Sequence, residues 1–265
     1  MAVRRRIVEI INVGNELLDG RTLNSNLHWL SGQLSMLGYL VSRATIVRDD
    51  VEEIAEVLRE AFRRRPRWIF VGGGLGPTHD DKTLNGVGRA FGLRLKLNRE
   101  ALEMLKNRYE EMVRKGLISS YTITKERLKM VKLPEGSTPL RNRKGSAPGV
   151  LLERRDVRIV CLPGVPDEMK DIFENEIRPI MERESGGRAY VVERMDVRGV
   201  FESSLAPLLV EAMKRFPGVY IKSNPKGFEG NVSVVSLDFI SERKYVDRLR
   251  AAKDLIRARL GEMGG

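Results

Sequence analysis

A short apolar segment, Trp68–Val71, leads directly into four glycines within five positions, and a helical pattern follows from about Thr83. A glycine turn between a strand and a helix is typical of parallel α/β sheets, and it brings backbone N–H groups close to a ligand. Asp80 and Asp81 stand where the helix is expected to begin. Amide donors beside carboxylates suit a phosphate that a divalent metal ion bridges to the protein. The pattern predicts an α/β protein that binds a phosphorylated or nucleotide-like ligand.

The same alternation of strands and helices continues through the first two thirds of the chain. Apolar strand patterns occupy 7–13, 39–47, 68–71, 150–152 and 158–162, and helical patterns occupy 27–37, 54–62, the residues from 83, and 167–183. Short links between these segments predict a three-layer, doubly wound, mostly parallel α/β sheet. A mixed helical stretch, Asn98–Lys129, is interrupted at Gly116 and is expected to be a lid or an oligomer contact.

A second domain is expected after a linker at Glu184–Arg188, which divides the chain into 1–185 and 186–265. The later segment holds strand patterns at 190–197, 219–222 and 232–240 and helical patterns at 201–216 and 242–260. These elements predict a small α+β domain.

In doubly wound sheets, ligands bind beyond the carboxyl ends of the strands. Gly14, Asn15 and Glu16 follow the first strand, Asp49 follows the second, and the glycine loop follows the third. The sequence therefore predicts that these three segments meet at one edge of the sheet.

The net charge is +11, from 47 basic and 36 acidic residues. The basic residues are spread along the chain and interleaved with acids, so we expect a charged surface rather than nucleic-acid binding. No apolar run reaches the roughly 18 residues of a membrane span, and the basic start leads into a strand rather than a signal peptide. A single cysteine, Cys161, fits a reducing cytoplasm.

Several common catalytic motifs are missing. The glycine loop has neither dinucleotide-binding nor P-loop spacing. Two separate histidines, His28 and His79, with one cysteine do not predict a zinc site. No nucleophile elbow or Cys–His arrangement is visible. Metal-assisted attack by water or by a phosphate is the chemistry that remains.

The acids and the proline-containing loop each allow two interpretations. Thr78 and Asp81 have capping-box spacing, so Asp81 either caps a helix or holds a metal ion together with Asp49. Asp50 and Asp80 are expected as caps or as neighbours of the metal site. The loop Leu162–Pro166 either binds an anion at a helix start or is ordinary structure.

Six segments taken together resemble the molybdenum-cofactor biosynthesis (MoaB/Mog-like) fold family, and most closely its CinA (competence/damage-inducible protein A) branch. They are 14–20, 24–26, 47–50, 73–83, Asn142 with 145–149, and 162–169. The resemblance covers about Ile7–Phe173, and the residues from Tyr190 resemble the smaller second domain of the same branch. It implies a molybdopterin-binding-like domain with the ligand lying across the glycine loop.

Molybdopterin-handling relatives have Gly-Gly-Thr-Gly in this loop, and acids that match Asp49 and Asp81 serve metal-dependent adenylyl transfer. Here Leu75 replaces the threonine, which disfavours pterin adenylylation. The CinA branch is associated with hydrolysis of ADP-ribose-type pyrophosphates, so a metal-dependent pyrophosphohydrolase is the leading hypothesis. The alternatives are a molybdopterin-binding or nucleotidyl-transfer protein and a non-catalytic nucleotide-binding scaffold. No nicotinamide-mononucleotide deamidase domain is expected after residue 265.

Asp49 and Asp81 are predicted to be catalytic and, with Asp80, to hold Mg, Mn or Co. The residues predicted to bind substrate or phosphate are Gly14, Glu16, Asn26, Gly73, Gly74, Leu75, Gly76, Thr78, Asn142 and Gly164. A small nucleotide-like substrate, a cytoplasmic location and a dimer or trimer of the chain are also expected.

Overall fold

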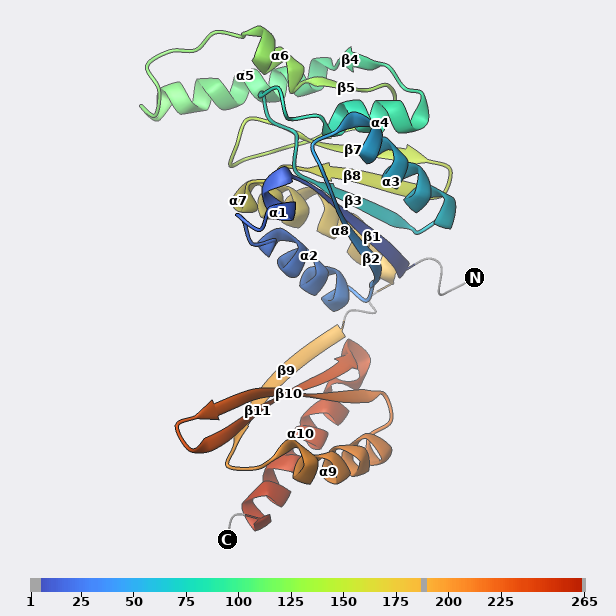
Figure 1. Cartoon of the computed structure of the whole chain (residues 1–265), viewed down its shortest axis with the longest axis vertical. Coiled ribbons are helices and arrows are strands. Elements are labelled where there is room, and N and C mark those ends of the chain that lie inside the picture. The colour runs from blue at the N-terminus through green and yellow to red at the C-terminus, as the bar shows by residue number, and fades with distance from the viewer. Residues whose placement is uncertain (1–5, 187–189, 264–265) are drawn as a thin grey trace. The chain divides into compact units, whose positions relative to one another are not determined.

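The computed structural model describes residues 6–186 and 190–263 of the chain. It divides into two compact units, Met1–Leu34 with Tyr39–Glu184 and Ser35–Gly38 with Ser185–Gly265 (Figure 1). Part of the predicted linker, Gly187 and Arg188, lies outside the described residues, whereas Glu184 and Ser185 belong to a helix.

The first unit contains the strands β1 (Ile7–Val13), β2 (Leu40–Val47), β3 (Trp68–Gly72), β4 (Leu95–Leu97), β5 (Lys132–Pro134), β6 (Thr138–Leu140), β7 (Gly149–Arg154) and β8 (Val157–Leu162). Its helices are α1 (Asn15–Leu18), α2 (Ser25–Met36), α3 (Val51–Arg64), α4 (Thr83–Phe91), α5 (Arg99–Arg114), α6 (Lys125–Lys129), α7 (Pro166–Ile172) and α8 (Arg178–Ser185), with a π-helical turn, η2 (Phe173–Ile177), between the last two.

The main sheet has the strand order β2-β1-β3-β8-β7-β6. Its first four strands are parallel, and β7 and β6 are antiparallel additions at one edge. Neighbouring central strands pair Ile10 with Phe70 and Phe70 with Val160. The prediction of a mostly parallel sheet is confirmed. The three-residue strands β4, β5 and β6 were not predicted, because segments this short carry no measurable periodicity.

Helices cover both faces of the sheet (Figure 1). On one face, Ile54 of α3 and Leu84 of α4 share a core with Val71 of β3. On the other face, Phe173 packs 6.0 Å from Phe70 of β3 and 5.5 Å from Trp29 of α2, measured between ring centroids. This alternation follows from strand geometry, which points successive side chains to opposite faces. The predicted three-layer arrangement is therefore confirmed.

The second unit is a three-stranded antiparallel sheet with two long helices. The strand order is β10-β11-β9, with β9 (Tyr190–Arg198), β10 (Val219–Glu229) and β11 (Val232–Glu242). α9 (Glu202–Arg215) and α10 (Val246–Met263) pack on it through Leu205 and Leu249, and a 3-10 turn, η3 (Arg243–Tyr245), precedes α10. The predicted α+β class is confirmed, although β10 extends beyond 222 because β11 pairs with it through Pro225 and Gly227 despite a register shift.

Candidate functional site

The parallel strands β1, β2, β3 and β8 end together, and we call this edge of the sheet the rim. Gly14, directly after β1, donates its N–H to the Val47 carbonyl of β2 at 3.1 Å. The Asn15 N–H donates to Asp49 Oδ2 at 2.8 Å. Gly73, directly after β3, donates its N–H to the Leu162 carbonyl of β8 at 2.9 Å. Backbone contacts thus bring the predicted segments onto one edge.

The glycine loop follows a path that requires glycine at two positions. Gly73 has φ +101°, and a Cβ atom there would lie 2.2 Å from the Val13 carbonyl oxygen. Gly74 has φ +65°, and its Cβ would lie 2.4 Å from Thr83 Oγ1. The buried Thr83 hydroxyl donates to the Gly73 carbonyl at 2.7 Å and fixes the loop against the start of α4. The loop is therefore held by its own backbone and by one buried hydroxyl.

Asp81 does not cap a helix. Helix α4 begins at Thr83, and its N-cap residue, Lys82, makes no side-chain capping bond. Asp81 Oδ2 instead accepts hydrogen bonds from the N–H of Thr78, at 2.8 Å, and from the Thr78 hydroxyl. That hydroxyl also contacts Asp80. The capping-box interpretation of Thr78 and Asp81 is wrong, because both residues lie in the loop before the helix.

Asp49 lies among other carboxylates at the rim. Burial is the main cause that raises its pKa above the ordinary value, and repulsion from Glu16, Asp80 and Asp81 acts in the same direction, against the hydrogen bond from Asn15. Within the described residues, no three His, Cys, Asp or Glu side chains approach closely enough to hold a metal ion by themselves. The rim therefore offers separate carboxylates rather than a closed metal cage.

Asp50 has a different task from its neighbour Asp49. Its carboxylate accepts hydrogen bonds from the N–H groups of Glu52 and Glu53 at 2.9 and 3.1 Å and so caps α3. These bonds lower the pKa of Asp50. Asp50 was expected either to cap a helix or to lie beside the metal site, and in the structure it caps α3.

Leu75 and Asn26 occupy positions that the sequence did not reveal. The Leu75 side chain is buried in the core shared with α3 and α4, so the loop presents backbone rather than this side chain at its surface.

Asn26 Nδ2 donates to the Gly164 carbonyl at 2.7 Å and ties the start of α2 to the β8–α7 loop. Its Oδ1 atom is buried without a hydrogen-bond partner. Asn26 and Gly164 therefore lie together at the same end of the sheet.

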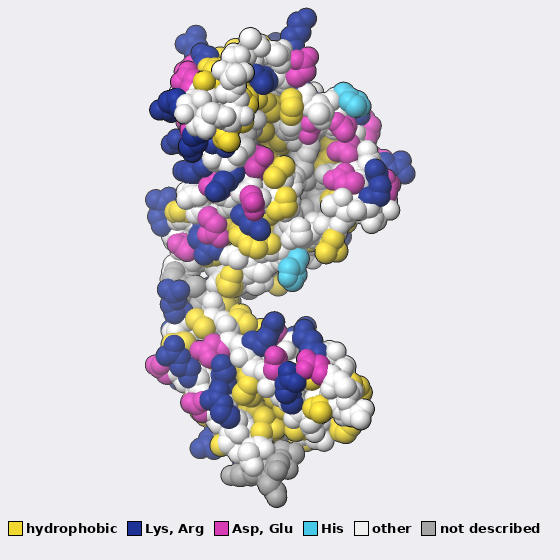
Figure 2. Space-filling model, turned by 90° about the vertical axis from the view of Figure 1, so that its left-hand side faces the viewer, with side chains coloured by type: hydrophobic (Ala, Val, Ile, Leu, Met, Phe, Trp, Pro, Cys, Tyr) yellow, Lys and Arg dark blue, Asp and Glu magenta, His cyan; other side chains and the backbone are white. Residues whose placement is uncertain are grey.

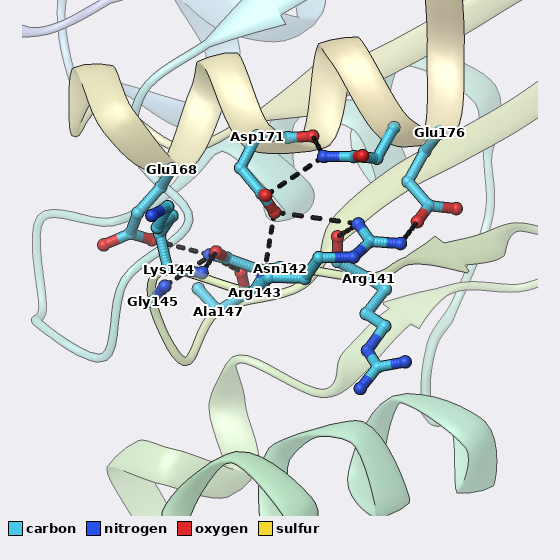
Figure 3. A network of polar contacts seen from close by, with 10 residues as sticks. Arg141, Asn142, Arg143, Lys144, Gly145, Ala147, Glu168, Asp171 and Glu176 are labelled. Carbon is cyan, nitrogen blue, oxygen red and sulfur yellow. Dashed lines mark hydrogen bonds and ion pairs between the residues drawn. The ribbon is translucent and has the colours of Figure 1, made fainter. Parts of the chain in front are cut away.

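Asn142 organises a separate loop, shown in Figure 3. Its Nδ2 donates to the Ala147 carbonyl at 2.8 Å and to Glu168 at 2.7 Å. Its Oδ1 accepts from the N–H groups of Lys144 and Gly145 at 3.0 and 2.7 Å. Because these four contacts use the polar atoms of the side chain, Asn142 shapes the loop in this structure.

Three side chains that the sequence did not single out also contribute to the site. Thr83 clamps the loop, as described above. A hollow of about 230 Å³ beside Gly74–Gly76 and Asp81 is lined by Lys129 and Lys132. The Lys129 ammonium group donates to the Thr78 carbonyl. Both lysines come from α6 and β5, some 50 residues away in the chain, and no local pattern in the sequence pointed to them.

The fold and the rim define a class of α/β protein with a glycine loop beside carboxylates at the carboxyl ends of parallel strands. The chain belongs to the family described as probable molybdopterin binding domain, which matches residues 9–183. The predicted family resemblance is thereby confirmed.

Relatives with high sequence identity span most of the chain. A Pyrococcus horikoshii protein is 45% identical over 86% of this chain and 88% of its own length. An Aeropyrum pernix protein is 43% identical over 97% of this chain and 94% of its own length. The crystal structure of CinA from Thermoplasma acidophilum, a protein with unknown function, superimposes with a TM-score of 0.60 at 34% identity, covering 67% of this chain and 99% of that one. In the described part of the chain, no helix is long and apolar enough to cross a membrane.

Proposed function

We propose that the rim binds a phosphorylated, nucleotide- or pterin-type ligand together with a divalent cation. The observation that carries this proposal is the position of Asp49 and Asp81 against the glycine backbone of the rim. Asp49 Oδ2 accepts the N–H of Asn15, next to Gly14, at 2.8 Å, and a Cβ atom on Gly76 would lie 2.7 Å from Asp81 Oδ2. Repulsion from Glu16, Asp80 and Asp81 contributes to raising the pKa of Asp49. Carboxylates that repel one another are suited to a divalent cation, although Lys129 also acts on Asp80. The proposal places Mg, Mn or Co at Asp49 and Asp81, with Asp80 beside them.

The absence of a three-ligand group among the described residues fits this assignment. Mg²⁺ commonly binds through one or two carboxylates plus waters and substrate phosphates, rather than in an all-protein cage. The ligand phosphates would therefore complete the coordination. Lys129 and Lys132, which line the hollow beside the loop, supply further positive charge for a diphosphate.

For the reaction, we propose hydrolysis of a nucleoside-diphosphate compound such as ADP-ribose. The oxygen of one water molecule bonds to a phosphorus atom, the bridging oxygen leaves with the other phosphate, and AMP and ribose 5-phosphate form. Asp49 would orient that water and accept its proton. N–H groups of the loop Gly73–Gly76 would stabilise charge on the phosphate oxygens. When bound, the cation would lower the charge of the phosphates.

A molybdopterin-binding or nucleotidyl-transfer role is the second candidate, and the comparisons support it better than hydrolysis. The matching family is described by probable molybdopterin binding. The core position of Leu75 supports it further, because a side chain that faces the core leaves the ligand-facing backbone of the loop unchanged. The buried position of Leu75 thus removes one argument against pterin binding.

The hydrolysis proposal is tested by measuring AMP release from ADP-ribose by chromatography with Mg²⁺, Mn²⁺ or Co²⁺. We expect Asp81→Asn and Asp49→Asn each to lower the rate at least 100-fold. Asp50→Asn is the matched control, because asparagine caps a helix about as well as aspartate, and it should keep the wild-type rate. Absence of AMP release by the wild-type protein with each metal would refute hydrolysis.

The second candidate has its own assay. Purified molybdopterin is titrated into the protein, and ATP with Mg²⁺ is then added to test for an adenylylated pterin. Binding with adenylate formation would favour transfer, and no binding would exclude it. ADP-ribose that raises the melting temperature without turnover, including in Asp81→Asn, would instead indicate a non-catalytic nucleotide-binding scaffold.

A further inference from the structure

A second cavity lies at the opposite end of the same sheet, where β3 and β8 begin. Its volume is about 770 Å³, which is within the range of small-molecule sites. The described residues that line it all belong to the first unit, and they include Phe62, Arg63, Arg65, Arg67, Arg155 and Glu184. The five residues of β3 place it roughly 17 Å from the rim. We call it the arginine cavity.

Three of these arginines carry unneutralised charge. Arg63, Arg65 and Arg155 are exposed, and no carboxylate of the described residues forms an ion pair with them. Arg67 differs, because it is paired with Glu184, which Arg158 also contacts. The other acid among the described residues of the lining is Asp156, so four arginines, at 63, 65, 67 and 155, stand against two carboxylates. Positive charge therefore prevails in the cavity.

The backbone gives a second, independent observation. Arg65 has φ +55° and Arg155 has φ +52°, and they are the non-glycine residues with positive φ among those described. Glycine or asparagine adopts this left-handed conformation with less strain. Arg65 ends α3, and Arg155 lies in the turn between β7 and β8, so two unrelated turns place an arginine where glycine fits better. Both side chains line the same cavity.

We propose that the arginine cavity binds an oligophosphate anion, such as the phosphate chain of a free nucleotide. Guanidinium groups match phosphate oxygens with paired N–H donors. Phe62, half-buried and packed edge-on against Phe91 at 5.1 Å between ring centroids, supplies an apolar wall for the attached group. A long nucleic-acid backbone fits less well, since the acids Asp156 and Glu184 line the cavity beside its arginines. On the opposite side of the first unit, which faces the viewer in Figure 2, basic and acidic side chains are also interspersed. This site does not depend on the function proposed for the rim.

The test is calorimetric titration of the full chain with inorganic tripolyphosphate and with ADP, in 0.15 M salt and EDTA. EDTA removes the divalent cation that the rim would need, and the arginine variants decide whether the remaining signal comes from the arginine cavity. The main variant is Arg65→Gly with Arg155→Gly, which removes both charges and relieves both left-handed positions. Arg63→Gln is a second variant that leaves both turns unchanged. The control is Arg114→Ser, at an exposed position of α5 outside both sites.

We expect one tripolyphosphate per wild-type chain and at least tenfold weaker binding by the double variant. Its urea midpoint should equal or exceed that of the wild type, which separates lost binding from lost folding. Arg63→Gln should also bind more weakly, and Arg114→Ser should bind as the wild type does. Unchanged affinity of the double variant, or an equal loss in Arg114→Ser, would overturn the proposal. So would an oligonucleotide that binds the cavity more tightly than tripolyphosphate or ADP.

Discussion

Substitution of Gly73 by alanine tests whether the glycine loop is held as described. A methyl group at this position would lie 2.2 Å from the Val13 carbonyl oxygen, and φ is +101°. The obstacle is backbone at the end of the central strand β1, so it cannot move aside as a flexible side chain would. The loop must shift, and the hydrogen bonds of Gly73 to Leu162 and Thr83 must weaken with it.

Two contributions set the size of the effect. A non-glycine residue in a sparsely populated backbone region costs about 1–3 kcal/mol. Overpacking against fixed neighbours adds about 1–3 kcal/mol. Gly73→Ala should therefore destabilise the first unit by about 2–6 kcal/mol. This is a large fraction of the roughly 5–15 kcal/mol by which a folded domain is typically stable.

Tryptophan fluorescence in urea is the suitable assay. Both tryptophans of the chain, Trp29 and Trp68, lie in the first unit, so the signal follows this unit even if the second unfolds separately. With an m-value of about 2–3 kcal/mol/M, the midpoint should fall by on the order of 1–3 M.

The neighbouring glycine provides a matched control. A Cβ at Gly72 would lie 3.4 Å from Asn12 Oδ1, an ordinary contact, and φ of Gly72 is not positive. Gly72→Ala should therefore change stability by less than about 1 kcal/mol. If Gly73→Ala shifts the midpoint no more than Gly72→Ala does, the described loop path is incorrect.

Three further predictions concern buried groups. Thr83→Val keeps the shape of the side chain but removes the donor to the Gly73 carbonyl, so it should destabilise the first unit by about 1–3 kcal/mol; Thr83→Ser should lose less, and equal losses would contradict this role. Burial raises the pKa of Glu168, against the hydrogen bond from Asn142, so the native protein keeps this proton to higher pH than the unfolded chain. The stability of the native protein should then fall as the pH rises from the ordinary pKa of a glutamate through the raised pKa of Glu168. In urea titrations between pH 4 and 8, Glu168→Gln should remove part of that fall. An unchanged dependence of stability on pH in this variant would contradict the prediction. Burial raises the pKa of Cys161 to about 12, so a thiol reagent at pH 8 should label it only after unfolding, and rapid labelling of the native protein would show that the thiol is accessible.

The sequence predicted the architecture well because periodicity and glycine placement are local signals. Runs such as Ile7–Val13 and Trp68–Val71 can be strands only if they are buried on both faces, which requires helices on both sides. The positions of Gly14, Asp49 and the glycine loop after their strands then placed them at one edge. The family resemblance, carried by the same segments, is confirmed by the match over residues 9–183.

The roles of individual side chains depend on contacts between distant segments. Asp81 and Thr78 have capping-box spacing, but α4 begins two residues after Asp81, so the spacing was misleading. Asp49 and Asp50 are adjacent, and only the structure shows that one caps α3 while the other lies among the carboxylates of the rim. Asn142 is hydrogen-bonded by its own loop and by Glu168 of α7, and Leu75 faces the core.

By itself, the sequence determined where the strands end and that glycines and acids directly follow these ends. It could do so because backbone strain and hydrophobic periodicity act over a few residues. The tertiary structure decided which charges meet. Lys129 and Lys132 reach the glycine loop from a distant helix and strand. Arg65 and Arg155, 90 positions apart in the numbering, line one cavity. Such encounters depend on chain topology, since side chains that share a site need no shared pattern in the sequence.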